Sequence, residues 1–92
     1  MNHTETASTY IASVKVTTQT YDLYHDAMHY DDGTTIAHYV LRSPKDSTKY
    51  WYAVRAGKPG MYYFQTIMGT EIKRGGNKVM FFIAGDTITH IQ

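Results

Sequence analysis

The stretch YDLYHDAMHYDDGTTIAHYVLR, residues 21–42, decides the fold because it reads as two strands joined by a tight turn. If Asp31-Asp32-Gly33 is a three-residue hairpin loop with Gly33 in the left-handed conformation, Tyr30 faces Thr34 and the pairs run outward from there. On one face this register sets Met28 against Ile36, Asp26 against His38, Tyr24 against Val40, and Asp22 against Arg42. Complementary cross-strand partners contribute about 0.2 to 1 kcal/mol each, and two of these pairs are complementary in polarity or charge. The sequence therefore predicts an antiparallel hairpin over residues 21–42.

A helix over residues 20–30 is the alternative interpretation of the first half of this stretch. Thr20 can cap such a helix, and Tyr21, Tyr24 and Met28 would form an apolar stripe along it. The complementary pairs favour the hairpin, and one short helix near residues 20–30 stays open as an α+β alternative.

The rest of the chain also reads as strands separated by turns. Tyr, Thr, Val, Ile and Phe dominate, which suits half-buried pleated strands, and clusters of turn-forming residues recur at short intervals. Near the C-terminus, a two-residue Gly85-Asp86 turn sets Ile83 against Ile88 and Phe81 against His90. We expect a mainly β fold, an antiparallel meander or small barrel-like sheet, with strands near residues 9–18, 21–30, 34–42, 49–56, 61–72, 78–84 and 87–91.

The length and composition indicate one small domain. The 92 residues form a single domain with a modest core. Residues 1–8 are polar and lack a strand pattern, so we expect a flexible, frayed terminus there. The chain contains no Cys, which fits a reducing cytoplasm. It shows neither a secretory signal nor an apolar run long enough to cross a bilayer, so we expect a cytoplasmic protein with no membrane partner.

Charge is distributed unevenly along the chain. The formal net charge is only +1, but residues 1–41 hold one base against five acids, whereas residues 42–92 hold eight bases against three acids. Clustered Lys and Arg raise a local positive potential that a balanced total conceals. The second half also contains the only Trp and three aromatic runs, at residues 50–52, 62–64 and 81–82. The partner expected for this half is a polyanion or an acidic protein surface.

Patterns for metal binding and for catalysis are weak. His25 and His29 would share one face of a helix, but on a strand this spacing leaves them about 13 Å apart, too far to hold one ion. The sequence has no nucleophile elbow, no Gly-rich phosphate loop with Lys and Ser or Thr, and no zinc-protease motif. Asp26 beside His38 could orient an imidazole, yet no nucleophile is fixed nearby. We expect no enzymatic activity, no metal and no cofactor.

The loop Lys73-Arg74-Gly75-Gly76-Asn77-Lys78 is the strongest local candidate for binding. Its glycines let an anion approach the backbone closely while its bases supply charge. The alternative is that Gly-Gly-Asn supplies the positive backbone dihedrals of a tight hairpin tip, with no ligand involved. Trp51 shares a strand face with Arg55, and further bases lie on neighbouring turns. We therefore predict a binding surface of Lys49, Trp51, Arg55, Lys58, Lys73, Arg74 and Lys78.

Nine tyrosines are the other unusual feature. Alternation along residues 49–55 puts Tyr50 and Tyr52 on one face and Trp51 on the other, so both faces of this strand carry rings. Either the sheet curls into a barrel around one set of rings, or it exposes a tyrosine-rich surface. Exposed Tyr and Trp beside Arg suit a protein interface or a single-stranded nucleic acid.

In its small size, lack of cysteine, tyrosine content, uneven charge and lack of a catalytic motif, the chain resembles the proteins that phages encode to block host defences, anti-CRISPR proteins especially. The resemblance covers the overall profile and no motif, so no site residue is transferred by it. It implies a stoichiometric inhibitor in the host cytoplasm that binds a CRISPR surveillance complex, a ribonucleoprotein, at the protein or guide-RNA surface used by target DNA. The alternatives are a small-barrel module that binds single-stranded nucleic acid directly, and a catalytic protein that uses the region of Asp26 and His38.

Overall fold

The computed structural model describes residues 3–16 and 18–91, and these two ranges contain strands and no helix. The strands are β1 (His3–Val16), β2 (Gln19–Tyr30), β3 (Thr35–Ser43), β4 (Asp46–Arg55), β5 (Met61–Gln65), β6 (Lys73–Arg74), β7 (Asn77–Lys78), β8 (Phe81–Ala84) and β9 (Thr87–His90). Within this part of the chain, one seven-stranded antiparallel sheet has the order β1-β2-β3-β4-β5-β8-β9, and β6 and β7 form a separate hairpin. The mainly β fold expected from the sequence is confirmed.

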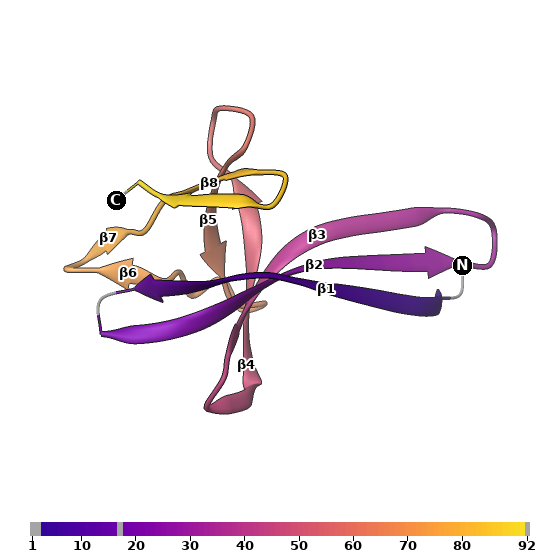
Figure 1. Ribbon diagram of the computed structural model, residues 1–92, viewed down its shortest axis with the longest axis horizontal. Coiled ribbons are helices and arrows are strands. Elements are labelled where there is room, and N and C mark those ends of the chain that lie inside the picture. The colour runs from indigo at the N-terminus through magenta and orange to yellow at the C-terminus, as the bar shows by residue number, and fades with distance from the viewer. Residues whose placement is uncertain (1–2, 17, 92) are drawn as a thin grey trace.

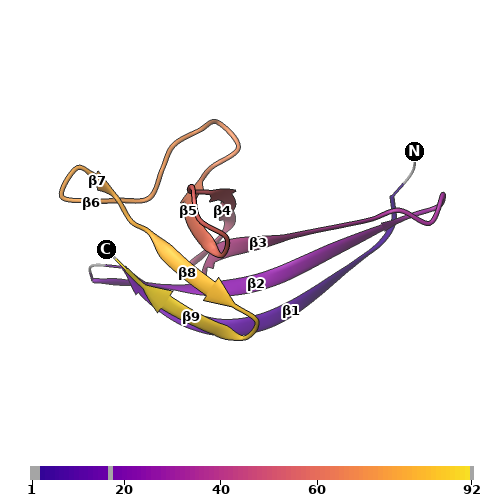
Figure 2. The same ribbon diagram turned by 90° about the horizontal axis from the view of Figure 1, so that it is seen from above.

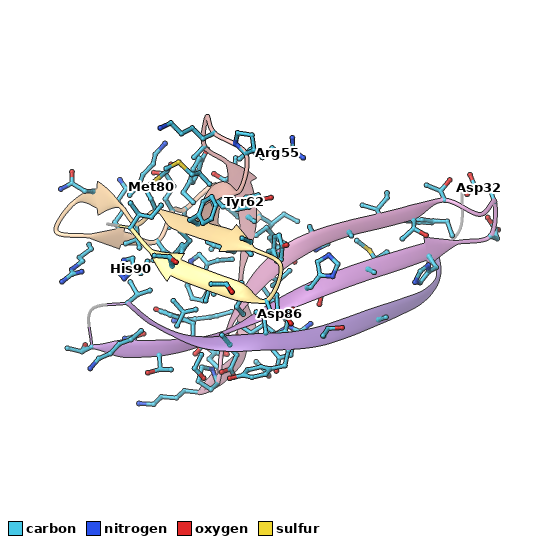
Figure 3. All side chains as sticks on the ribbon, turned by 45° about the horizontal axis from the view of Figure 1, so that its top comes forward. Asp32, Arg55, Tyr62, Met80, Asp86 and His90 are labelled. Atoms are coloured by element: carbon cyan, nitrogen blue, oxygen red, sulfur yellow. The ribbon has the colours of Figure 1, made fainter. Side chains whose placement is uncertain are left out.

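The large sheet twists until its first and last strands approach each other. β9 lies alongside β1 in Figure 2, although the two are not paired by backbone hydrogen bonds among the described residues. The sheet is therefore barrel-like and nearly closed. β1, β2 and β3 extend beyond the barrel as a three-stranded arm (Figure 1), whose tip is marked by Asp32 in Figure 3.

β2 and β3 pair in the register that the sequence predicts. Asp22 lies opposite Arg42 and Asp26 lies opposite His38. At the loop, the Tyr30 N–H donates to the Thr34 carbonyl at 2.9 Å, and Gly33 has a φ of 89°. The alternative of a helix near residues 20–30 is wrong, because β2 is the second strand of the sheet and pairs along this stretch with β1 and β3.

The side chains of Arg42 and His38 interact with residues other than the ones directly opposite them. Arg42 reaches past its direct partner Asp22 to Asp26, with its Nη2 3.2 Å from Asp26 Oδ2 and its guanidinium 4.2 Å from the centre of the Tyr24 ring. The His38 ring lies against Tyr52 instead, with ring centres 5.8 Å apart. Tyr24 is the nearest diagonal neighbour of Arg42 on this face, within reach of a long side chain, and Asp26 lies two residues beyond it. The length of the Arg42 side chain therefore lets it extend over the Tyr24 ring and reach Asp26, four residues along β2 from Asp22.

Two predicted boundaries need correction. Residues 1–8 were expected to form a frayed terminus, but β1 begins at His3 and residues 3–8 pair with β2; residues 1 and 2 lie outside the described residues. A polar sequence is compatible with a strand here because this part of β1 belongs to the arm, outside the barrel (Figure 1). The strand expected over 61–72 ends at Gln65, because a turn from Thr66 to Gly69 reverses the chain, with the Gly69 N–H donating to the Thr66 carbonyl at 2.9 Å.

The predicted C-terminal hairpin is confirmed. Ile83 lies opposite Ile88, and Phe81 lies opposite His90 with their rings stacked at 5.3 Å between centres. β8 pairs with β5 as well as with β9, so it links the C-terminal strand to the rest of the sheet.

One hydrophobic core fills the barrel. Its buried members come from both halves of the chain: Val14, Val16, Leu23, Leu41, Phe64, Ile72, Val79, Phe81 and Ile83. Trp51 and Ala53 pack against this core, whereas Tyr50 and Tyr52 on the opposite face of β4 are 38% and 36% exposed. Both outcomes expected for the rings thus occur together: the sheet curls around one set and exposes another.

A pair of glycine substitutions tests the turn geometry. Gly33 and Gly60 both have positive φ, but a Cβ at Gly33 would meet nothing within 4 Å, whereas one at Gly60 would lie 2.8 Å from Phe82 Cε1 and 3.2 Å from the Ile83 carbonyl oxygen. We expect Gly33→Ala to lower the free energy of unfolding by about 1 kcal/mol through backbone strain alone. Gly60→Ala should cost about 2 kcal/mol or more, because steric overlap is added. Urea denaturation measures both, and equal losses would contradict the close approach of β8 to Gly60.

Candidate functional site

The seven residues of the predicted binding surface lie in three separate places. Lys73, Arg74 and Lys78 are on the β6–β7 hairpin, Arg55 and Lys58 are at the β4–β5 loop, and Lys49 and Trp51 lie toward the other end of β4. Figure 1 shows the three regions pointing in different directions, and Figure 3 shows Arg55 beside the β4–β5 loop. Arg55 lies six positions along β4 from Lys49, which corresponds to about 20 Å of strand. The structure does not gather the seven residues into one patch, and their part in binding stays a prediction.

The bases of the β6–β7 hairpin are partly neutralised within the chain. Lys78 Nζ lies 3.1 Å from a carboxylate oxygen of Glu71 and 4.2 Å from the centre of the Tyr63 ring, and Lys73 Nζ lies 4.0 Å from the other oxygen of Glu71. Gly75 and Gly76, with φ of 59° and 85°, form the two-residue turn between the strands. The geometry therefore supports the alternative explanation, that the two glycines serve the hairpin turn.

Two clefts flank the end of the β3–β4 hairpin. The larger, here called the β2 cleft, has a volume of about 390 Å³ and is lined by residues 18–21, residues 43–46, Lys49 and Trp51. The smaller, here called the β5 cleft, has a volume of about 280 Å³ and is lined by residues 48–52 together with Thr66 and Ile67. Lys49 and Trp51 line both clefts, so two residues of the predicted surface stand at the centre of this region. We call the two clefts together the hairpin-end site.

Each cleft lies where a strand continues beyond its neighbour. The pairing of β2 with β3 ends at Asp22 and Arg42, so within the described residues Gln19–Tyr21 pair with β1 alone. In the same way, β5 pairs with β4 from Tyr52 to Arg55, which leaves the earlier residues of β4 without a β5 partner in the described chain. The clefts are therefore gaps between strands, bordered by open backbone edges.

The charges of the β2 cleft are two lysines and one aspartate. Asp46 Oδ1 accepts hydrogen bonds from the Thr48 hydroxyl at 2.6 Å and from the Thr48 N–H at 3.0 Å. These hydrogen bonds, with a smaller contribution from the charge of Lys49, lower the pKa of Asp46 below its ordinary value. Asp46 is thus ionised at neutral pH, and Lys45 and Lys49 leave the cleft with one net positive charge.

Trp51 forms the aromatic part of the hairpin-end site. Its ring meets that of Tyr21 edge-on, with centres 5.1 Å apart and an interplanar angle of 72°. Because Trp51 also packs against the core, its ring is held in place by the barrel. Tyr50 and Tyr52 add exposed rings on the outer face of the same strand.

The sequence pattern missed an apolar turn beside the β5 cleft. Ile67 and Met68 occupy the middle of the Thr66–Gly69 turn and are 86% and 88% exposed. The turn is fixed by a hydrogen bond from the Thr66 N–H to the Thr70 carbonyl at 2.8 Å and by one from the Thr70 N–H to the Thr66 hydroxyl at 3.1 Å. The one available signal was Gly69, since Gly is favoured at the last position of a β-turn. We call Ile67 and Met68 the apolar tip.

Comparison with known proteins finds no family model, curated protein or solved structure that matches the chain. In residues 3–16 and 18–91, no helix is long and apolar enough to span a bilayer. Among the same residues, His, Asp and Glu do not come together in groups of three or more that could hold a metal ion.

Proposed function

We propose that this chain is a non-enzymatic binding protein whose hairpin-end site and apolar tip dock onto a protein partner. The observation that carries the proposal is the apolar tip, two large aliphatic side chains that are almost fully exposed on a turn fixed by hydrogen bonds. Fully burying a side chain of this size contributes about 1.5 to 3 kcal/mol, which an interface gains and the isolated chain does not. Met and aromatic residues are enriched at such interfaces, and Ile67 lines the β5 cleft together with the exposed Tyr50 and Tyr52.

The apolar tip favours a protein over single-stranded nucleic acid as partner. Proteins bind single strands through flat rings on which bases stack, and aliphatic side chains offer no such surface. Trp51 is half-buried and its ring already meets Tyr21. A single-stranded nucleic-acid module is the second candidate function, supported by Lys45 and Lys49 beside the Trp51 ring in the β2 cleft.

The partner that we propose is a CRISPR surveillance complex or a similar nucleoprotein machine. Its support is the resemblance in size, composition and charge to phage-encoded inhibitors of host defence. A surface that joins apolar anchors to lysines suits a complex in which protein and nucleic acid lie side by side. The chain would act by covering the surface that target nucleic acid needs.

Capture and titration test this function. The chain, carrying an affinity tag, is used to capture its partner from bacterial lysate, and the purified partner complex is then titrated with the chain while its binding of target DNA is measured. We expect inhibition to be complete at one chain per complex and not to grow with incubation time. Inhibition by far less chain than complex would reveal turnover and contradict the proposal. Tight binding of bare oligothymidylate that weakens steeply with salt would support the second candidate instead.

A further inference from the structure

We propose that the β2 cleft binds an extended peptide segment that carries one carboxylate, and that this segment adds to the sheet as a short strand beside Gln19–Tyr21. The inference rests on the proposed function, since it names the kind of partner segment that the hairpin-end site takes.

The open backbone edge of β2 is the first support. Successive residues of an antiparallel strand direct their N–H and C=O groups alternately to the two sides. Gln19–Tyr21 pair with β1 on one side, and β3 begins to pair with β2 only at Asp22. At least one of these three residues therefore presents both backbone groups to the cleft. An added peptide strand supplies the matching donor and acceptor, and three residues of strand span about 10 Å.

The charge of the cleft is the second support. The ion pairs formed among the described residues involve neither Lys45 nor Lys49. With Asp46 ionised, the cleft holds one net positive charge, which one carboxylate neutralises through charge-assisted hydrogen bonds. A run of phosphates would also meet the Asp46 carboxylate, and like charges repel. The charge pattern therefore fits an acidic peptide better than a nucleic-acid strand.

The rings of the cleft are the third support. Tyr21 and Trp51 line the cleft in edge-on contact with each other. Alternate side chains of an added strand point to the same face, so one apolar peptide side chain can reach these rings. The cleft volume of about 390 Å³ lies within the usual range for ligand sites, roughly 300 to 1,000 Å³.

Titration with short peptides, followed by amide NMR spectra of the full chain, tests the inference without knowledge of the partner. The probe is acetyl-Val-Thr-Val-Asp-amide, and the matched control carries Asn in place of Asp. We expect the Asp probe to shift the amide signals of Gln19, Thr20 and Tyr21, and to bind about tenfold more tightly than the Asn control, because hydrogen bonds to charged groups are stronger. In the Lys45→Gln, Lys49→Gln double variant, the two peptides should bind equally weakly.

Three outcomes would overturn the inference: equal affinity of the Asp and Asn peptides for the parent, shifts confined to residues outside the cleft, or binding of oligothymidylate in place of the peptide. The Ile67→Ser variant separates this inference from the proposed function, because Ile67 lines the β5 cleft and should leave peptide binding unchanged. If the captured partner needs the apolar tip but the peptide does not bind, the peptide inference fails and the function stands. If the peptide binds but partner binding is insensitive to the tip, the proposed docking surface fails.

Discussion

The Phe81→Ala variant is expected to lose about 3 to 5 kcal/mol of unfolding free energy, the usual cost of removing a buried phenyl ring. Phe81 has no exposed surface, contacts Phe64 edge-on at 5.2 Å and stacks on His90. Its strand joins β5 to β9, so the cavity would open where the C-terminal hairpin meets the barrel. The free energy of unfolding of native domains is only about 5 to 15 kcal/mol. We therefore expect this variant to be partly unfolded at about 37 °C.

The neighbouring Phe82→Ala variant is the matched control. Phe82 points to the opposite face of β8 and is 37% exposed, so its removal creates no enclosed cavity. We expect a loss of about 1 kcal/mol, measured by urea denaturation followed by circular dichroism. Similar losses for the two variants would mean that the inner and outer faces of β8 are assigned wrongly.

The Ile67→Ser, Met68→Ser double variant is expected to weaken partner binding by about 100-fold or more. This factor corresponds to about 2.7 kcal/mol, which is within the contribution of burying two large apolar side chains. Because both side chains are exposed in the free chain, the unfolding free energy should change by less than about 0.5 kcal/mol. Affinity for the captured partner is measured by calorimetry.

The Ile36→Ser variant controls for the loss of exposed apolar surface in general. Ile36 is 44% exposed but lies on the arm, in β3, near the loop marked by Asp32. Its substitution should leave partner affinity unchanged. An equal loss of affinity in both variants, or none in the double variant, would show that the partner does not dock on the apolar tip.

The hairpin of β2 and β3 was predictable because its information is local. A glycine at the loop and complementary polar residues spaced four apart on each strand favour the register, and Asp22 and Arg42 lie opposite each other as expected. The actual ion pair of Arg42 with Asp26 was not predictable from register alone, because it depends on how far the Arg side chain leans along the strand. The same local logic holds for the Gly85-Asp86 turn.

The start of β1 and the end of β5 were not predictable from alternation. Residues 3–8 form a strand in an arm outside the barrel, so burial imposed no apolar pattern there. In the sequence, Ile67 and Met68 look like further residues of β5, and only the tertiary structure shows that they lie in a turn. A strong β preference thus concealed the apolar tip.

The candidate site was predictable only in part. Trp51 and Lys49 emerged from composition and charge, but the clefts around them depend on where β3 and β5 separate from their neighbours, which no local pattern records. The ion pairs of Glu71 with Lys73 and Lys78 partly neutralise the β6–β7 loop and weaken the prediction that this loop binds an anion. Glu71 lies only two residues before Lys73, so the sequence already contained this signal.

Amide hydrogen exchange of the chain, alone and bound to its captured partner, tests most directly whether the hairpin-end site and apolar tip form the docking surface. Groups buried in an interface exchange more slowly, and the method reports on every segment at once. We predict slower exchange at residues 48–52 and 66–70 in the complex, with no change at residues 73–78. Slower exchange at residues 73–78 with none at residues 66–70 would contradict the proposed surface and restore the basic loop as the partner-binding site.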